Sequence, residues 1–484
     1  MIRKNSNPAS VLEKSRNDPA WWVKNVLGDK PWPIQAKILK SLVHNRETNV
    51  KSSHSVGKSW VAARASLWFL FNYPGSLVIT TAPTDRQVRG ILWKEIRTAF
   101  KNAKLPLGGK VLTQQLNIRD DWLAMGFTAN DYDPDKFQGF HSQHVLVVVD
   151  EACGITDAID QGIESILSSE HSRLLRIGNP TNENTPFGRS FKAAEGSKFT
   201  ISAFDTPNMT SFGITPNDIV SGAWKEKVVS SLPYPTLVTP QWVDHQYKKW
   251  GLNSPIWQAR VMGEFPSNQD NTLIPLSWIE AAQRRVIEPS VNDKITFGID
   301  VSRFGANETI VMKKHGNHAR IVGSWGAADT MQTSGKIIHL SNQWNPVNIF
   351  VDSVGVGGGV VDRLRESHIK YGVYDVNAGS SAKDKTRFLN MRAELFWNLR
   401  EKFEKGEIDI DPHDEDLVAQ LCEIQFSVAS NGKIKIESKD DMRKRGINSP
   451  DRADALALAF KGSKMFSYDF ELSDAGRQEN PWKI

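Results

Sequence analysis

A run of apolar residues that ends in two acids, HVLVVVDEA (144–152), limits strongly the folds that this chain can adopt. A continuous apolar run suits a strand that is buried on both faces, as in parallel sheets covered by helices. SLVITTA (76–82) and RLLRIGNPT (173–181) are similar, and helical patterns such as DRQVRGILWKEIRTAF (85–100) alternate with them. The alternation from about residue 50 to 179 predicts an α/β domain with a parallel sheet.

The segment VKSSHSVGKSW (50–60) lies between a short predicted strand and an apolar helix. In a phosphate-binding loop, backbone N–H groups and a helix N-terminus converge on phosphate oxygens. We expect Lys58 to reach the β- and γ-phosphates and Ser59 to hold Mg²⁺. The remaining nucleotide-binding positions expected in the loop are Ser52, Ser55 and Gly57. Ser52 replaces the first glycine of the pattern, but it is small enough for the turn. The alternative is an ordinary strand–turn–helix with a surface lysine.

The acids that end the apolar run at 144–152 form a Walker B pattern. We expect Asp150 to hold the shell of Mg²⁺ and Glu151 to polarise the attacking water. The alternative is a pair of N-cap residues for the next helix. Because both patterns occur in order within one α/β region, a nucleotide site is favoured.

Two weaker signals fit the same site. Gln35, in WPIQAKIL (32–39), precedes the loop, and a glutamine amide can pair with the edge of adenine. A surface glutamine at a helix start is the alternative. Asn179 and Thr181 follow a predicted strand and can sense the γ-phosphate, although Asn-Pro is also a common turn.

The second half of the chain carries carboxylates at the ends of apolar runs. Asp300 ends one run in FGIDVSRFG, and Asp352 ends another in IFVDSVGVGGG. Asp451 and Asp454 open a predicted helix, and their spacing places them on one face. Clustered carboxylates suit Mg²⁺ or Mn²⁺, and two such ions can clamp a phosphodiester during hydrolysis. A strand meander at 295–325 followed by alternation resembles the ribonuclease H-like nuclease fold.

The two motif sets together resemble the large terminase subunit of tailed bacteriophages, from about residue 32 to 460. The motifs are HSVGKS, VVVDEA and GNPT, followed by GIDVSRFG, VDSVGVGGG and SPDRADAL. The resemblance implies a DNA-packaging motor that hydrolyses ATP, translocates double-stranded DNA into a procapsid and cuts concatemeric DNA. Many members carry an arginine inside the loop, whereas this chain has His54 and Val56 there.

The resemblance also implies roles and partners. Lys58, Ser59 and Asp150 become ligands of ATP and Mg²⁺, and Glu151 becomes the catalytic glutamate. The implied metal ligands of the nuclease, with Mg²⁺ or Mn²⁺, are Asp300, Asp352, and Asp451 or Asp454. The implied partners are double-stranded DNA, a portal protein, a small terminase subunit and further copies in a ring, usually pentameric. The implied location is the host cytoplasm, with docking on the procapsid.

Length and composition agree with a two-domain protein. A chain of 484 residues is too long for one ordinary core. We expect an ATPase domain at 1–265, a Pro-, Asn- and Ser-rich linker at 266–292, a nuclease domain at 293–464 and a mobile tail at 465–484. The net charge of +5 permits a polyanionic partner. Two cysteines are too few for a disulfide framework, and no apolar run is long enough to span a membrane.

Two other functions remain open from the sequence. One is a helicase or repair ATPase whose second domain binds DNA without cutting it. The other is a structural capsid component that binds nucleotide during assembly. Metal-dependent cleavage of DNA distinguishes the packaging motor from the helicase or repair ATPase. DNA-stimulated ATP turnover distinguishes it from the structural capsid component.

Overall fold

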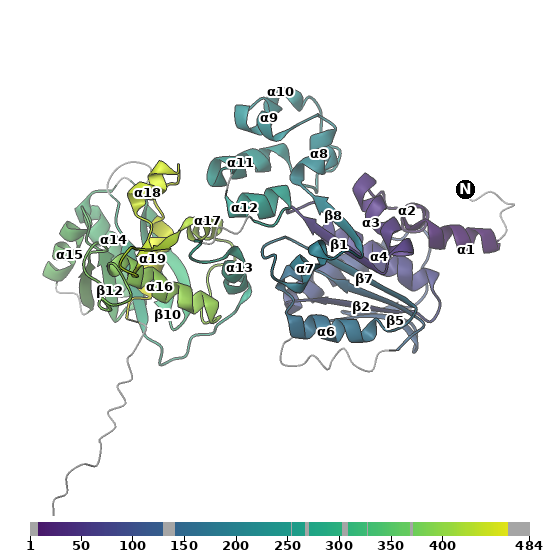
Figure 1. The fold of residues 1–484 in the computed structure, drawn as a ribbon, viewed down its shortest axis with the longest axis horizontal. Coiled ribbons are helices and arrows are strands. Elements are labelled where there is room, and N and C mark those ends of the chain that lie inside the picture. Colours follow the sequence, from purple (N-terminus) through teal and green to yellow (C-terminus); the bar gives the residue numbers. More distant parts are fainter. Residues whose placement is uncertain are drawn as a thin grey trace, which may run out of the picture. The chain divides into compact units, whose positions relative to one another are not determined.

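The computed structural model describes residues 8–128, 141–252, 254–266, 271–302, 308–326, 328–367 and 371–462. The chain forms two compact units (Figure 1). The first unit contains residues 1–286, 409–426 and 440–447, and the second unit contains 287–408, 427–439 and 448–484. Because these six segments alternate, the chain passes between the units at five places. The predicted tail at 465–484 lies outside the described residues.

The first unit is built on a sheet of eight strands within the described residues. In spatial order, the strands are β3 (Lys110–Val111), β4 (Gln115–Arg119), β5 (Trp122–Thr128), β2 (Leu77–Ala82), β6 (His144–Val149), β7 (His171–Gly178), β1 (Glu47–Ser52) and β8 (Ser197–Ile201). The strands from β5 to β8 are parallel, and β3 and β4 extend one edge in antiparallel fashion. The parallel sheet predicted from the apolar runs is therefore present, and β6, β7 and β1 are neighbours.

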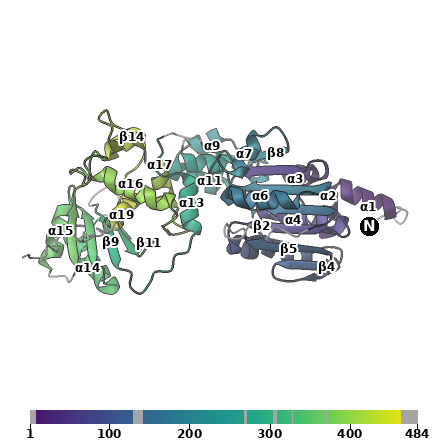
Figure 2. The ribbon, with the colours of Figure 1, turned by 60° about the horizontal axis from the view of Figure 1, so that its bottom comes forward.

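Some helices of the first unit pack on this sheet, and others lie beyond its edges (Figures 1 and 2). They are α1 (Pro8–Asn17), α2 (Pro19–Trp22), α3 (Pro33–His44), α4 (Lys58–Asn72), α5 (Trp93–Lys101), α6 (Asp157–Ile166) and α7 (Pro186–Lys192), followed by α8 (Pro207–Thr210), α9 (Pro216–Ser221), α10 (Trp224–Lys227), α11 (Pro240–Trp250), α12 (Pro255–Trp257) and α13 (Leu276–Arg284). Short π-helical or 3-10 segments are η1 (Val23–Leu27), η2 (Arg86–Leu92), η4 (Ala152–Gly154), η5 (Ala203–Asp205) and η6 (Gln258–Met262). The helix predicted at 85–100 thus forms as η2 and α5.

Burial explains why these elements form. Strand β6 has buried residues on both faces, as its uninterrupted apolar sequence predicts. Helix α6 buries Ile159, Ile163 and Ile166, one stripe along the helix, against the sheet residues Val147 and Leu174. Each such buried side chain contributes about 1.5–3 kcal/mol to folding. Helix α4 is buried along most of its length, so the loop before it is held on a rigid element.

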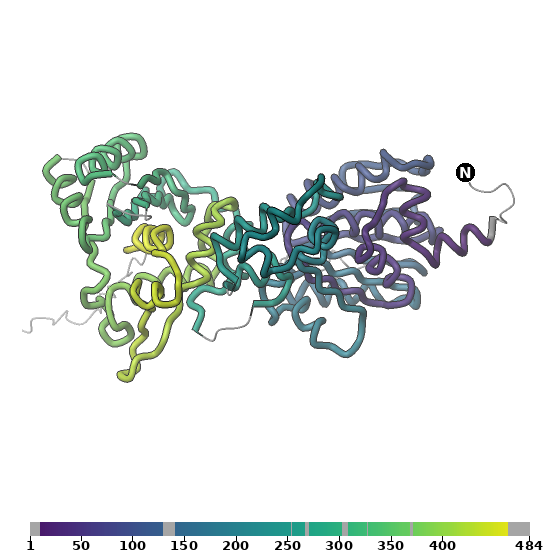
Figure 3. The backbone as a smooth tube through the Cα atoms, turned by 90° about the horizontal axis from the view of Figure 1, so that it is seen from above, coloured from purple at the N-terminus to yellow at the C-terminus, as the bar shows by residue number. Residues whose placement is uncertain are grey.

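Part of the first unit comes from the second half of the sequence. Helix α17 (Glu415–Glu423) packs against α13, and the backbone N–H of Ile410 donates to the carbonyl of Ala282 at 3.4 Å. In the tube view, the yellow-green segment of α17 returns beside the teal residues of α13 (Figure 3). Helix α13 lies inside the predicted linker and is buried at Leu276, Ile279 and Ala282. The domain boundaries predicted from the sequence stay a prediction.

The second unit has a mixed sheet with the topology of ribonuclease H-like domains. Its strands, in spatial order, are β11 (His318–Trp325), β10 (Thr309–His315), β9 (Ile295–Asp300), β12 (Asn348–Asp352) and β13 (Gly372–Val376). Strands β9, β10 and β11 form an antiparallel meander, whereas β12 and β13 continue parallel to β9. The predicted fold class is confirmed: an α/β parallel-sheet unit is followed by a ribonuclease H-like unit.

The second unit also contains α14 (Thr330–Trp344), α15 (Gly357–Glu366), α16 (Met391–Glu404), β14 (Phe426–Val428), β15 (Ile434–Ile436) and α19 (Asp451–Ala459) (Figure 2). Helix α18 (Lys439–Lys444) begins at the last residue of a second-unit segment, and its other residues belong to the first unit. Helix α19 lies directly on β9 at Gly298, where an added Cβ atom would be 2.1 Å from the carbonyl oxygen of Ala455. This close approach brings the start of α19 to the end of β9. Among the described residues, no helix has the length and apolarity that a membrane span needs.

Candidate functional site

The loop at 53–57 connects β1 to α4 at the edge where the parallel strands end. Ser55 and Gly57 have positive φ values of 54° and 84°, so the loop turns sharply before the helix begins at Lys58. Glycine adopts such values freely, whereas serine does so at some cost. No side chain caps the N-terminus of α4, so its N–H groups remain suited to an anion.

Five predicted residues take part in hydrogen bonds at this edge. The Lys58 ammonium donates to the carbonyl of Ser53 and to Oδ1 of Asn179, each at 3.1 Å. Asn179 Nδ2 in turn donates to the carbonyl of Ser52 at 2.7 Å. The Ser59 hydroxyl donates to Oδ2 of Asp150 at 2.9 Å. The structure thus brings the loop, the end of β6 and the end of β7 together.

Asp150 is a buried carboxylate with a raised pKa of about 6. Burial is the main cause and the Glu151 charge adds to it, while the hydrogen bond from Ser59 and the charge of Lys58 oppose the shift. Glu151 has a positive φ of 49°, unusual for a residue with a side chain. A buried carboxylate beside a hydroxyl fits Mg²⁺, because a cation offsets the cost of the buried charge.

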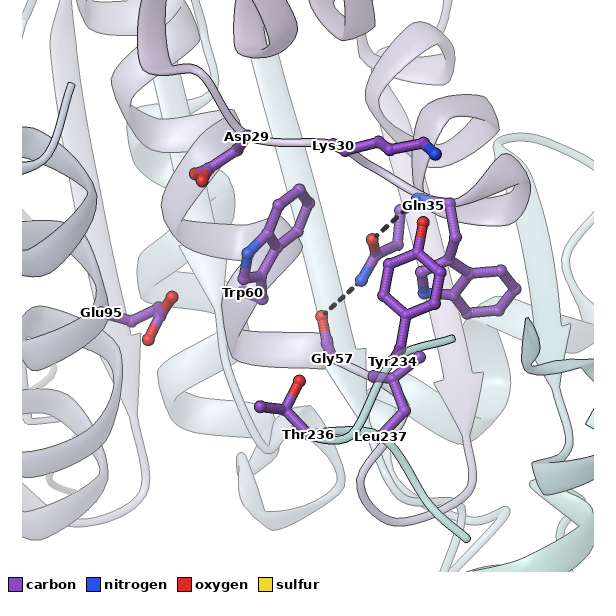
Figure 4. Close-up of a pocket in the computed structure, with 10 residues that line it drawn as sticks. Asp29, Lys30, Gln35, Gly57, Trp60, Glu95, Tyr234, Thr236 and Leu237 are labelled. Atoms are coloured by element: carbon purple, nitrogen blue, oxygen red, sulfur yellow. Dashed lines mark hydrogen bonds between the residues drawn. The ribbon is translucent and has the colours of Figure 1, made fainter. Parts of the chain in front are cut away.

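Gln35 lines a cavity of about 470 Å³ beside the loop (Figure 4). Its Oε1 accepts from the backbone N–H of Trp32 at 3.3 Å, and its Nε2 donates to the carbonyl of Gly57 at 3.4 Å. The amide therefore already links the start of α3 to the loop. Aromatic rings form much of the remaining wall, from Trp32, Trp60 and Tyr234.

Sequence reasoning missed these three aromatic residues. Trp60 lies in an apolar helix and Tyr234 in the turn-rich stretch SSLPYPTL, where nothing in the local pattern indicates a cavity. Thr181, suggested with Asn179 as a sensor, instead donates to the sulfur of Cys153 at 3.3 Å.

The carboxylates of the second unit gather at one end of its sheet. Asp300 ends β9 and Asp352 ends the parallel neighbour β12, whose residue Val351 pairs with Ile299. Asp451 and Asp454 lie in the first turn of α19, which packs on β9. The four acids thus meet although they lie up to 154 positions apart (454 − 300).

Burial and the charges of neighbouring residues shift the pKa values of these four acids. Burial raises the pKa of Asp300, Asp352 and Asp451, and the charge of Asp454 adds to the shift in each. Burial would also raise the pKa of Asp454, but the neighbouring Arg392 and Lys439 hold it below its ordinary value. Three acids therefore carry unfavourable negative charge, which a divalent cation would relieve.

Lys439 and Arg392 supply the positive charge of this cluster. The Lys439 ammonium lies 2.8 Å from Oδ2 of Asp454 and 3.4 Å from Oδ2 of Asp300. Arg392 Nη1 donates to Oδ1 of Asp454 at 2.6 Å. Burial alone would lower the pKa of Lys439, but Asp454 and Asp300 raise it above its ordinary value. The Lys439 ammonium thus lies between Asp454 and Asp300, and the sequence motifs gave no sign of Lys439 or Arg392.

Within the described part of the chain, no group of three or more His, Cys, Asp or Glu side chains is already arranged as a metal site. The acids nevertheless fit a cation chemically, because their oxygens are hard ligands and their negative charge is only partly neutralised. The backbone N–H of Glu308 donates to Asp451 at 3.2 Å, so one oxygen of this acid is already positioned. The assignment of metal ligands stays a prediction.

The sequence is similar to that of a known terminase subunit. It is 23% identical over 461 residues to the probable terminase large subunit of Enterobacteria phage P7, covering 90% of this chain and 88% of that protein. The predicted resemblance to large terminase subunits is confirmed. No model of a protein family matches the sequence.

Solved structures of large terminase subunits are also similar. A large terminase from a thermophilic bacteriophage is 12% identical, with 92% of this chain and 97% of that chain covered and a TM-score of 0.39. The nuclease domain of the large terminase subunit gp2 of bacterial virus Sf6 is 21% identical, with 39% and 97% covered and a TM-score of 0.36. These TM-scores are low, so the confirmation rests on the sequence similarity.

Proposed function

We propose that this chain is the ATP-hydrolysing and DNA-cleaving subunit of a viral genome-packaging motor. The observation that carries the proposal is the hydrogen bond from Lys58 to Asn179 beside the hydrogen bond from Ser59 to Asp150 at the sheet edge. The same chain gathers four acids in a ribonuclease H-like unit. Sequence similarity to a terminase large subunit over 90% of the chain supports it.

In the first unit, the proposed role of each residue follows from its position. Lys58 is poised to leave Asn179 and contact the β- and γ-phosphates of ATP, and Asn179 then senses the terminal phosphate. Ser59 and Asp150 would hold Mg²⁺, which supplies charge neutralisation at the phosphates when bound. Glu151 orients the attacking water. The loop residues Ser52, Ser55 and Gly57 shape the backbone around the phosphates, and the cavity at Gln35 is placed to receive the base.

In the second unit, we assign Asp300, Asp352 and Asp451 as ligands of Mg²⁺ or Mn²⁺. Asp454 is already neutralised by two bases, so Asp451 is the nearer ligand and Asp454 joins it when Lys439 moves away. Two bound ions would activate water and stabilise the leaving oxygen of the DNA strand. The proposed partners are double-stranded DNA, a portal protein, a small terminase subunit and further copies in a pentameric ring, docked on a procapsid in the host cytoplasm.

Two assays on the full chain test this function. ATP turnover is measured with and without linear double-stranded DNA, and nicking of supercoiled plasmid is measured in Mg²⁺, Mn²⁺ and EDTA. The proposal expects DNA-stimulated turnover and cleavage only with metal. Stimulated turnover without cleavage would favour the helicase or repair ATPase, and the absence of stimulated turnover would favour a structural capsid component.

Replacing Glu151 with glutamine should give a chain that binds ATP and fails to hydrolyse it. The amide keeps the size of the side chain but removes the charge that orients water, while the loop and Lys58 are unchanged. Binding of a fluorescent ATP analogue should stay within about twofold of the original, and turnover should fall by about 10²–10³-fold. Exposed Glu164 on α6 provides a matched Glu→Gln control. Loss of binding together with turnover would contradict the assigned role.

Replacing Lys439 with alanine should strengthen Mn²⁺ binding to the acids of the second unit. The change removes the ammonium that lies between Asp454 and Asp300, so a divalent ion no longer competes with it. We expect an affinity gain of about tenfold, which corresponds to about 1.4 kcal/mol, by titration calorimetry. Lys444→Ala, an exposed position on the same helix, is the control. Unchanged or weaker Mn²⁺ binding in Lys439→Ala would show that the ammonium does not occupy the cation position.

A further inference from the structure

Arg260 is a buried arginine that joins the phosphate loop to two distant helices. It lies on η6, and its backbone carbonyl accepts from the N–H of His54 in the loop at 3.0 Å. Its guanidinium pairs with Glu280 of α13 at 3.2 Å and with Glu415 of α17. One residue thus contacts the loop through its backbone and both helices through its side chain.

The backbone around Arg260 is tightly fitted to the loop. Gly263, just after η6, has a φ of 67°, and an added Cβ atom there would lie 2.4 Å from the carbonyl oxygen of Ile201 and 2.9 Å from the N–H nitrogen of Ser53. The same Ser53 N–H donates to the Ile201 carbonyl at 2.8 Å. A shift of the loop therefore forces a shift of η6, because no free space separates them.

The charges make the link costly to break. Arg260 and Glu280 are both buried, and the side chain of Glu415 is 36% exposed. Burial alone would lower the pKa of Arg260, yet the two glutamates raise it, so the guanidinium stays charged. Removing one partner from a buried ion pair leaves an uncompensated charge, so the three side chains act as a unit.

The helices joined in this way flank the second unit in the sequence. Helix α13 ends shortly before β9, which carries Asp300, and α17 lies between α16 and β14. The mechanism proposed for ATP hydrolysis makes no use of Arg260, Glu280 or Glu415.

We propose that Arg260 is a positioning residue of the ATPase site, which links the phosphate loop to α13 and α17 so that nucleotide binding orders both helices. The inference rests on the proposed function, because it needs a nucleotide at the loop. A hydrogen-bond and ion-pair network of this kind can couple two sites, since both sites bias one packed arrangement. Nucleotide ordering of the loop then favours the arrangement in which Arg260 holds both glutamates.

Hydrogen exchange of the full chain, with and without a non-hydrolysable ATP analogue and Mg²⁺, tests the proposal. In the original protein, exchange at 53–60, 276–284 and 415–423 should slow by about fivefold or more when the analogue binds. In Glu415→Gln the loop and α13 should still be protected, whereas protection of α17 should be lost. Arg260→Lys should retain part of the effect, because it keeps the charge but loses the forked geometry.

A matched control is Arg176→Lys. Arg176 is another buried arginine of the first unit that pairs with two carboxylates, Glu47 at 3.0 Å and Asp160 at 2.9 Å, but these pairs do not involve α13 or α17. This variant should lose stability and keep the nucleotide-dependent protection of α17. If Arg260 has only a structural role, replacing it should lower the protection of α13 and α17 equally with and without nucleotide.

The outcomes separate the inference from the function on which it rests. If the analogue protects the loop but neither helix, or if Glu415→Gln keeps full protection of α17, Arg260 does not transmit nucleotide binding. If the analogue fails to protect the loop in the original protein, the nucleotide site is wrong and both proposals fail. Loss of protection of α17 in Glu415→Gln alone, with unchanged analogue affinity, supports the inference.

Discussion

Replacement of Lys58 by alanine is expected to lower ATP turnover by at least about 10²–10³-fold and to leave metal-dependent DNA cleavage unchanged. Lys58 begins α4 and is held by Ser53 and Asn179 at the edge where β1 and β7 end. In the proposed mechanism this ammonium contacts the β- and γ-phosphates of ATP. Alanine keeps the helix, because it has the highest helix propensity, so the loss is one of charge and not of fold.

Steady-state turnover with saturating DNA measures the effect, and the melting temperature checks the fold. Lys40→Ala, an exposed lysine of α3, is the matched control and should behave like the original protein. If Lys58→Ala turns over ATP at a near-normal rate, the segment at 50–60 is a structural turn and not a phosphate-binding loop.

The second large effect is expected from Asp300→Asn, which should reduce plasmid cleavage by at least about 10²-fold while ATP turnover persists. Asp300 is buried at the end of β9, next to Asp352 on the neighbouring strand and the acids of α19. Asparagine has the same shape but lacks the charge that two divalent ions require. Because burial raises the pKa of Asp300, the neutral amide should also be tolerated by the fold.

Cleavage of supercoiled plasmid in Mg²⁺ and in Mn²⁺ is the measurement, with DNA-stimulated turnover of the same sample as the internal reference. Asp375→Asn, an exposed aspartate on β13 that pairs with Arg365, is the control. If Asp300→Asn cuts plasmid at the original rate, or if cleavage is equal in EDTA, Asp300 is not a metal ligand.

The elements that sequence predicted well are those whose signal is local. Strand β6 could be found because every residue of VLVVV is apolar, and the acids after it fall at the sheet edge by the geometry of parallel strands. The same reasoning placed Asp300 and Asp352 at the ends of strands, and the fold makes these two strands neighbours. In both cases one short stretch of sequence predicts the strand and also shows that an acid lies at its end.

The parts that sequence missed depend on contacts between distant residues. Arg260 and Glu415 are 155 positions apart, and neither stands in a recognisable motif. Lys439 begins a short polar helix, so only the fold shows that its ammonium lies between Asp300 and Asp454. The cavity beside the loop is formed by Trp32, Trp60 and Tyr234 from three separate segments, which no periodicity connects.

The repeated passage of the chain between its two units has a consequence for genetic exchange. A recombination joint at residues 286/287 would give a hybrid the sheet of the first unit from one parent and all later residues from the other. Helix α17 would come with the second parent, although Leu417, Val418 and Leu421 are buried in the first unit, where α17 packs on α13. Functional hybrids should therefore be confined to parents whose residues match at α13 and α17. Relatives that have exchanged all residues after 286 should show paired changes at positions 260, 280 and 415.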